Sequence, residues 1–301
     1  MRKLAFVFAG QGDQFPGMGR DLYEKYPAAA EVFRQCEKLR PGTMEQCFSG
    51  TEAELQETKN TQPCLYAFEL AAAAVLKEYG IRPAAAAGFS LGEVAAAAFA
   101  GMFDTETGFR LVMKRGELMQ AAAELQETSM AAVLRLPEET VQALCAQYSS
   151  VYPVNYNCPG QIAVSGAADE MNAFSESVRN AGGRAVMLKV KGAFHSPFMK
   201  DAAAAFAAVL AETELHPAQV LLYADMTAEP YEGDAARILS SQICSPVLWE
   251  KIIRRMIASG IDGFLEIGPG RTLSGMIRKI DPEVRTYSMA ELPLLLEETG
   301  R

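Results

Sequence analysis

The chain has 301 residues, half of them hydrophobic, and a formal net charge of −9 at pH 7. This length allows a large buried core in one or two domains, and the acidic balance argues against nucleic acid as a general partner. No apolar run in the sequence reaches the roughly 18 residues that a membrane helix needs, and the N-terminus does not have the pattern of a signal peptide. We therefore expect a globular, cytoplasmic protein.

Cysteine and histidine are too scattered to suggest a metal site. The chain has six cysteines but no C-x-x-C pair, and its two histidines form no H-E-x-x-H motif. This usage is typical of reduced thiols in a cytosolic protein rather than of zinc ligands. We expect no bound metal and no permanently bound cofactor.

The first part of the chain alternates between predicted strands and helices. A short apolar strand is followed by a glycine-rich loop, and Pro63 suits the first turn of a helix. A second strand leads to Ser90, and Asp104 or Thr105 can cap the next helix. This alternation predicts an α/β fold. The ranges are strand 3–8, loop 10–19, helix 61–79, a strand that ends before residue 89, and helix 105–124.

The middle of the chain follows a different pattern. Its predicted order βαββαβ is that of a ferredoxin-like unit, with strand 130–134, helix 137–148, strands 152–157 and 161–165, helix 169–181 and strand 184–190. We predict a discontinuous large α/β domain over 1–127 and 193–301, interrupted by a small ferredoxin-like subdomain over 128–192.

Ser90 lies between Gly88 and Gly92 in a G-x-S-x-G pattern. A nucleophilic serine on a strand-to-helix turn needs flanking residues without side chains, because the backbone passes close by on both sides. The chain carries 24 glycines, so the same pattern also fits a serine that only caps a helix. A partner base has to decide between the two interpretations.

Of the two histidines, His195 is the better candidate for that base. It follows a predicted strand and precedes Ser196-Pro197, which reads as the cap and first residue of a helix. The positive end of a helix dipole disfavours imidazolium, so the ring is expected to be neutral, as a general base requires. His216 lacks such a setting. The alternative is a purely structural histidine.

Arg115 stands out because its helical neighbours are all apolar. The residues three and four positions away are Leu111, Val112, Leu118 and Met119, so no carboxylate on the same helix can pair with it. Either an anionic ligand pairs with the guanidinium, or the side chain reaches water or a distant carboxylate.

These features, with several others in the same order, resemble the malonyl-CoA:acyl-carrier-protein transacylases. The match is collinear over nearly the whole chain, and that many motifs in order are highly specific. The resemblance implies an α/β-hydrolase-like large domain with an inserted ferredoxin-like subdomain, as predicted above. The matching segments are Gly10–Gly19, Thr61–Pro63, Gly88–Glu93, Arg115–Gln120, Asn155–Gln161, Gly192–Ser196, Gln242–Trp249 and Glu266–Gly270.

The resemblance also implies a mechanism. Ser90 would accept the malonyl group from malonyl-CoA and pass it to the phosphopantetheine thiol of an acyl carrier protein, in a ping-pong reaction through malonyl-serine. His195 would take and return the proton. The backbone carbonyl of Gln242 would orient His195, so that the site is a dyad without the usual acid.

The remaining roles follow by matched position. Backbone N–H groups of Gln11 and Leu91 would form the oxyanion hole. Arg115 would pair with the free carboxylate of malonyl and so select it over acetyl. Gln62 and Asn157 would line the pocket. The partners expected are malonyl-CoA and acyl carrier protein, without nucleic acid or membrane, and the chain is expected to be a monomer.

One position departs from the family, and three other functions stay open. Phe89 stands where the family usually has histidine, which leaves His195 as the one credible base. The carrier could belong to fatty acid biosynthesis or to a polyketide synthase served by a free-standing acyltransferase. A serine thioesterase or hydrolase would normally place its histidine near the C-terminus, whereas here the chain continues from His195 to Arg301. A non-catalytic acyl-binding or CoA-binding subunit would need no dyad.

Overall fold

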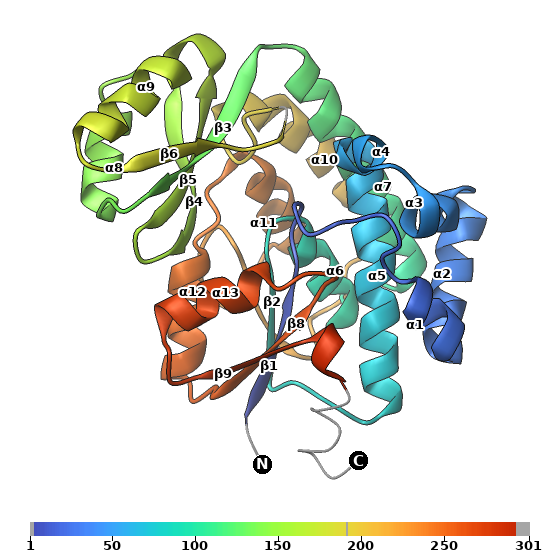
Figure 1. The fold of residues 1–301 in the computed structure, drawn as a ribbon. Helices are drawn as coiled ribbons and strands as arrows, with labels where there is room; N and C mark the ends of the chain where they lie inside the picture. Colours follow the sequence, from blue (N-terminus) through green and yellow to red (C-terminus); the bar gives the residue numbers. More distant parts are fainter. Residues whose placement is uncertain (1–2, 191, 293–301) are drawn as a thin grey trace.

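The computed structural model describes residues 3–190 and 192–292. Its strands form two separate sheets with helices packed against both (Figure 1). The larger sheet has five strands in the order β7-β2-β1-β8-β9, and every pair in it is parallel. These strands are β1 (Leu4–Phe8), β2 (Ala85–Gly88), β7 (Leu221–Tyr223), β8 (Gly263–Ile267) and β9 (Arg285–Ser288).

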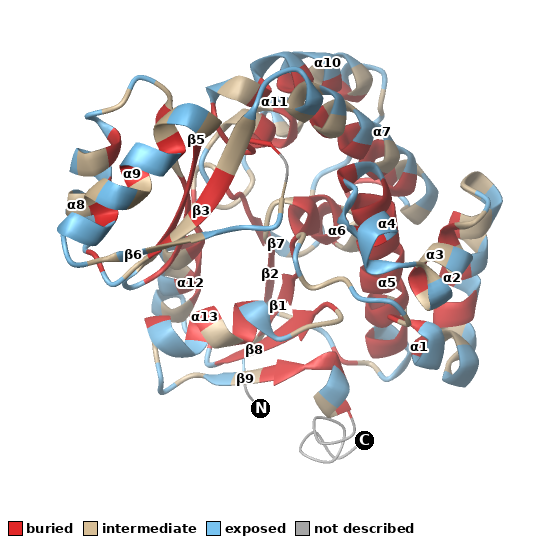
Figure 2. Ribbon diagram, turned by 45° about the horizontal axis from the view of Figure 1, so that its top comes forward, coloured by how far each residue is buried: buried red, intermediate tan, exposed pale blue. Residues whose placement is uncertain are grey.

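Both faces of the parallel sheet are covered by helices. Side chains alternate along β1, so that Phe6 and Phe8 enter one hydrophobic cluster while Ala5 and Val7 enter another. The first cluster contains α2 (Pro27–Leu39), α5 (Thr58–Glu78), α6 (Leu91–Phe99), α7 (Thr105–Glu124) and α10 (Lys200–Ala211); the second contains α12 (Trp249–Ala258) and α13 (Thr272–Ile280). Figure 2 shows the central strands as almost wholly buried. The predicted α/β class is confirmed.

Shorter helices complete the large unit. They are α1 (Arg20–Lys25), α3 (Thr43–Ser49), α4 (Glu52–Gln56), α11 (Ala235–Ser241) and the 3-10 turns η1 (Pro197–Met199), η2 (Gln242–Cys244) and η3 (Met289–Glu291). Within the described ranges, no helix combines the length and the apolar character needed to cross a membrane.

The second sheet is antiparallel and has the strand order β4-β5-β3-β6. Its elements follow the predicted βαββαβ order, as β3 (Thr128–Leu134), α8 (Glu138–Cys145), β4 (Val151–Cys158), β5 (Gln161–Ala167), α9 (Ala168–Asn180) and β6 (Arg184–Met187). One face of the sheet packs on α8 and α9, which lie on the outer side of the molecule in Figure 1. The opposite face looks toward the parallel sheet. The exact domain boundaries, 128 and 192, stay a prediction.

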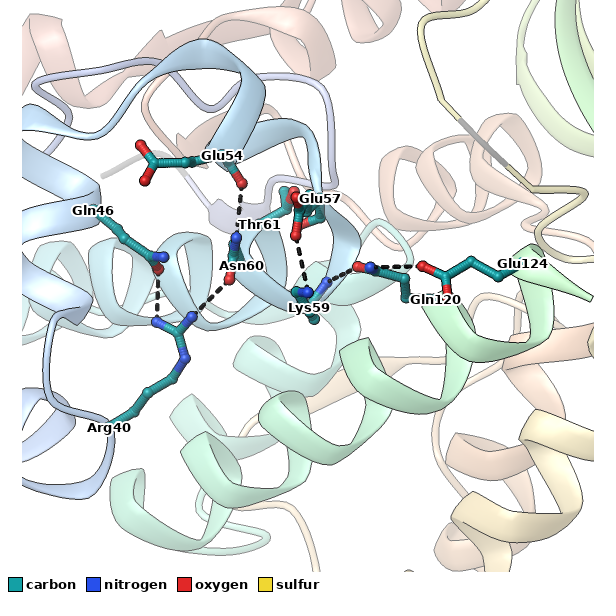
Figure 3. Close-up of polar contacts among 9 residues, drawn as sticks. All are labelled: Arg40, Gln46, Glu54, Glu57, Lys59, Asn60, Thr61, Gln120 and Glu124. Atoms are coloured by element: carbon teal, nitrogen blue, oxygen red, sulfur yellow. Dashed lines mark hydrogen bonds and ion pairs between the residues drawn. The ribbon is translucent and has the colours of Figure 1, made fainter.

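The start of α5 differs from the prediction. The helix begins at Thr58, so Pro63 lies inside it rather than in its first turn. Polar contacts with neighbouring elements hold this start in place (Figure 3). Arg40 donates 2.7 Å hydrogen bonds to Gln46 and Asn60, and the backbone N–H of Lys59 donates to Gln120 on α7. These anchors offset the backbone hydrogen bond that proline removes.

Other ranges also shift, among them the helix predicted over 137–148, which ends at Cys145. The last strand of the small sheet ends at Met187, three residues earlier than predicted. The helix predicted to begin at Pro197 is a 3-10 turn followed by α10, which starts at Lys200. Such differences at element ends arise because fraying and 3-10 turns leave little trace in the hydrophobic pattern.

Gly92 and Gly275 differ in how much space surrounds them. A Cβ on Gly92 would lie 2.3 Å from the carbonyl oxygen of Phe8, whereas a Cβ on Gly275 in α13 would meet nothing within 4 Å. Gly92→Ala should therefore destabilise the protein by about 1–3 kcal/mol or more through overpacking. Gly275→Ala, the matched control, should stabilise it by about 0.5–1 kcal/mol through helix propensity. Urea denaturation measures both; equal effects would contradict the packing argument.

Candidate active site

Ser90 lies on a strained turn between β2 and α6. Its backbone has φ 56° and ψ −103°, which a residue with a side chain seldom adopts. It occupies the N-cap position of α6, yet its side chain makes no capping hydrogen bond. A Cβ on Gly88 would lie 1.9 Å from backbone atoms of Gly92, so the turn requires glycine. The capping interpretation of this serine is therefore wrong.

The hydroxyl of Ser90 contacts the imidazole of His195. The distance from Ser90 Oγ to His195 Nε2 is 2.7 Å. His195 Nδ1 lies 3.0 Å from the backbone oxygen of Gln242 and 3.2 Å from that of Ser245. Two carbonyl oxygens can only accept, so the proton resides on Nδ1 and Nε2 is free to accept from the serine hydroxyl.

The imidazole is held in its neutral form chiefly by burial. Burial, and next the positive charge of Arg115, lower the pKa of His195 from 6.5 to about 4, against the opposing hydrogen bonds to Gln242 and Ser245. The segment after Ser196 is a 3-10 turn of three residues, with the longer helix starting only at Lys200. The predicted charge state agrees with this pKa, whose largest cause is burial, and a contribution from the helix N-terminus stays a prediction.

Arg115 reaches the same hydroxyl from α7. Its side chain is wholly buried, and its Nη2 donates to Gln242 Oε1 at 2.6 Å and to Ser90 Oγ at 3.3 Å. Its Nε and Nη1 have no hydrogen-bond partner among the described residues. Burial lowers the pKa of Arg115 to about 10, so it stays charged at neutral pH, with two donors to spare.

A cavity of about 340 Å³ opens onto Ser90 and His195. Gln11, Leu91 and Gln62 line it from the large unit, and Asn157 lines it from β4. Such a volume suits a small ligand or the end of a larger one. Met130, Ala132 and Ala163, on the face of the small sheet opposite α8 and α9, supply much of its apolar wall.

Several polar atoms around this cavity lack partners. The backbone N–H groups of Gln11 and Leu91 donate to no acceptor in the described part of the chain. Gln62 Oε1 and Asn157 Oδ1 are also buried without a partner there, although Gln62 Nε2 lies 3.3 Å from the sulfur of Met119. Buried polar atoms normally find partners, so these groups are available to a ligand.

The predicted site residues thus lie in two layers. Six of them line the cavity, while Arg115 and Gln242 lie behind Ser90 and do not contribute to the lining. Phe89 contributes an apolar wall and packs its ring against Trp249, with centroids 5.5 Å apart at 67°. His216 lies outside this cavity, exposed beside Glu214. Among residues 3–190 and 192–292, no group of three potential ligands could hold a metal ion.

The sequence reasoning missed three residues and the side chain of Gln242. Glu93 and Asp225 are both wholly buried, and Tyr231 donates to Glu93. The sequence could have indicated Glu93, because it is the one charged residue in the otherwise apolar helix 91–99. Asp225 had a weaker signal, since it follows a short apolar strand in a parallel sheet, where ligand sites gather.

The low pKa of His195 gives a pH prediction. Ser90 reacts only while His195 is unprotonated, so its reactivity should persist below pH 6.5 and fall as the pH drops through about 4. Phenylmethanesulfonyl fluoride has no group that titrates in this pH range, so the rate at which it sulfonylates Ser90 measures the reactivity of the serine at each pH. His195→Ala should remove the pH-dependent reaction. A midpoint near 6.5 would show that burial and Arg115 do not act on the ring.

Comparisons with known proteins place this geometry in a family. Residues 5–292 match the model of the acyl transferase domain. The malonyl CoA-acyl carrier protein transacylase of Bacillus subtilis is 38% identical over 97% of this chain and 94% of its own length. The crystal structure of the corresponding transacylase from Clostridium perfringens superposes with a TM-score of 0.94 at 34% identity, covering 99% of this chain and 98% of that one.

A further solved structure contains a carrier protein. It is a type II polyketide synthase acyl-carrier protein in complex with its malonyl-transacylase, with a TM-score of 0.95 and 32% identity, covering 98% of this chain and 99% of that one. These relatives match nearly the full length of both chains, and they confirm the resemblance and the fold inferred from the motifs. The chain belongs to the acyltransferase family of the malonyl-CoA:acyl carrier protein transacylases.

Proposed function

We propose that this protein transfers the malonyl group from malonyl-CoA to the phosphopantetheine thiol of an acyl carrier protein, through a malonyl-serine intermediate on Ser90. The proposal rests on one observation, that a base, His195, and a cation, Arg115, both contact the hydroxyl of Ser90. His195 Nε2 lies 2.7 Å and Arg115 Nη2 lies 3.3 Å from Ser90 Oγ. The first activates a nucleophile, and the second suits an acyl group that carries a negative charge.

In the first half-reaction, Ser90 Oγ attacks the thioester carbonyl while His195 Nε2 takes the hydroxyl proton. The carbonyl becomes a tetrahedral oxyanion, for which the unpaired N–H groups of Gln11 and Leu91 are the proposed donors. The intermediate then collapses, the C–S bond breaks, and the imidazolium returns its proton to the departing CoA thiolate. The products are malonyl-serine and free CoA.

The second half-reaction reverses these steps with a different thiol. His195 takes the proton of the phosphopantetheine thiol, and its sulfur attacks the malonyl-serine ester. Collapse of the intermediate returns the proton to Ser90 Oγ. An apolar cavity wall that limits water would favour the thiol over hydrolysis as the second acceptor.

Fatty acid biosynthesis is the proposed destination of the malonyl group. The B. subtilis and C. perfringens relatives are malonyl CoA-acyl carrier protein transacylases, and this chain matches nearly the whole length of both. A polyketide carrier is the second candidate, supported by the solved complex of a type II polyketide synthase carrier with its malonyl-transacylase. We propose that the enzyme acts in the cytoplasm and needs no permanently bound cofactor.

Removing the nucleophile tests the covalent step. After mixing with malonyl-CoA in the absence of carrier, the wild-type protein should gain the mass of one malonyl group. This adduct should persist for much longer than one cycle of transfer takes when the carrier is present. Ser90→Ala should gain no malonyl group and transfer none, while its melting temperature stays close to that of the wild type. Intact-mass spectrometry reads the adduct. Rapid release of malonate by the wild-type protein would instead indicate a hydrolase.

Removing the cation tests the selectivity. Arg115→Ala should lower kcat/KM for malonyl-CoA by about 100-fold or more, because the malonyl carboxylate then lacks a charged partner. Acetyl-CoA should lose far less. The control is Arg110→Ala, which removes an exposed arginine from the same helix. Steady-state transfer to carrier protein with both donors measures the ratio, and equal losses would remove the selective role of Arg115.

A further inference from the structure

Behind Ser90, on the side away from the cavity, two buried carboxyl groups meet. Glu93 comes from the first turn of α6, and Asp225 follows β7 by two residues. Both side chains are wholly buried. Two adjacent carboxylates in a dry interior repel each other strongly, so one of them retains a proton.

The hydrogen bonds identify which of the two is ionised. Glu93 accepts from three donors, namely the Tyr231 hydroxyl at 2.5 Å, the Gln242 amide at 2.7 Å and the backbone N–H of Asp225 at 3.3 Å. Asp225 accepts only through Oδ2, and its Oδ1 has no partner among the described residues. A carboxylate with three donors is the better stabilised anion, so Glu93 is ionised and Asp225 carries the proton.

The pKa values point the same way. Burial, and next the negative charge of Glu93, raise the pKa of Asp225 well above its ordinary value. Burial raises the pKa of Glu93 to about 7, although the hydrogen bonds from Tyr231 and Gln242 oppose this rise. The other titratable groups that face the pair are Tyr231 and Arg115.

Gln242 connects this pair to the catalytic groups. Its side-chain NH2 lies 2.7 Å from Glu93 Oε2, 3.1 Å from Asp225 Oδ2 and 2.6 Å from the backbone oxygen of Ser90. Its side-chain oxygen accepts from Arg115 at 2.6 Å, and its backbone oxygen accepts from His195. The amide thus turns its oxygen to the cation and its NH2 to the carboxyl groups. Rotating the Gln242 amide by 180° would place its NH2 against the guanidinium of Arg115, so that two donors faced each other.

We propose that Glu93 and Asp225 hold a single proton, carried by Asp225, and that this pair positions Gln242 and sets the charge behind Ser90. With one proton, the buried charges of Arg115 and Glu93 cancel. An incoming malonyl carboxylate then meets a cation whose Nε and Nη1 are unpaired. Without the proton, the unit would carry a net negative charge and repel that carboxylate. The effect on selectivity rests on the proposed malonyl transfer.

Two isosteric variants should behave differently. Asp225→Asn keeps an oxygen for the N–H groups of Ser90 and Gln242 and an NH2 in place of the acid proton, so near neutral pH it should lower kcat/KM by less than Glu93→Gln does. Glu93→Gln removes one acceptor and sets an NH2 against existing donors, so kcat/KM should fall by about 10- to 100-fold. A larger loss in Asp225→Asn than in Glu93→Gln would overturn the assignment of the proton.

The pH dependence separates a charge effect from a loss of structure. In the wild-type protein, the ratio of kcat/KM for malonyl-CoA to that for acetyl-CoA should fall as the pH rises and Asp225 ionises. In Asp225→Asn it should stay level above about pH 7, where Glu93 is ionised. The control is Glu266→Gln, which removes a buried carboxylate that accepts from Leu273 and Ser274 and should lower the melting temperature while keeping the wild-type pH profile of the ratio. The same fall in Asp225→Asn would overturn the proposal.

A spectroscopic test needs no substrate. The infrared difference between wild type and Asp225→Asn at neutral pH should show the carbonyl stretch of one protonated carboxylic acid, and its absence would overturn the proposal. If the band is present but wild type transfers no malonyl group, the proposed function fails and the shared proton stands.

Discussion

The site depends on one close backbone approach, between the start of α6 and the end of β1. A Cβ on Gly92 would lie 2.3 Å from Phe8 O and 2.5 Å from Ala9 O, so only glycine lets the helix begin there. This contact fixes the strained turn at Ser90 and brings the loop after β1 beside it. Because the same loop carries Gln11, the nucleophile and the candidate oxyanion donors are aligned by packing alone.

A second constraint is electrostatic. Arg115 is completely buried, and a buried cation is costly unless polar groups surround it. The molecule offsets that cost by placing the Gln242 amide between the guanidinium and the carboxyl groups of Glu93 and Asp225, and no described carboxylate forms a direct ion pair with Arg115. The guanidinium is thereby held in place, while its Nε and Nη1 have no partner among the residues that the structure describes. A direct bidentate ion pair would have occupied those donors.

Much of the fold could be predicted because its signals are local. The apolar strand at the N-terminus, the Asp104 cap and the βαββαβ order each follow from short-range pattern, and the structure confirms them. The start of α5 could not be predicted in this way. Pro63 reads as a first-turn residue, but contacts from Arg40 and Gln120, distant in sequence, allow the helix to begin earlier.

The residues of the candidate site also divide into those with a local sequence signal and those that depend on tertiary contacts. Ser90, His195 and Arg115 carry motif or neighbour signals, and the structure brings their side chains together. Asp225 does not, because its importance arises from a partner 132 positions away in the sequence. Periodicity and motif spacing report on residues within one element, whereas a buried polar network joins several elements through tertiary packing. Only coordinates reveal such a network.

The carbonyl support of His195 has a consequence for the direction of the reaction. A carboxylate beside the ring would stabilise the imidazolium, but backbone oxygens carry only partial charge and Arg115 opposes protonation. The ring therefore holds a proton briefly and gives it up readily to the thiolate of either CoA or the carrier arm. CoA and the carrier arm present the same kind of sulfur, so the exchange is close to thermoneutral. Such a base suits an enzyme that equilibrates two pools of thioester, with the concentrations of the two thiols deciding which way the acyl group moves.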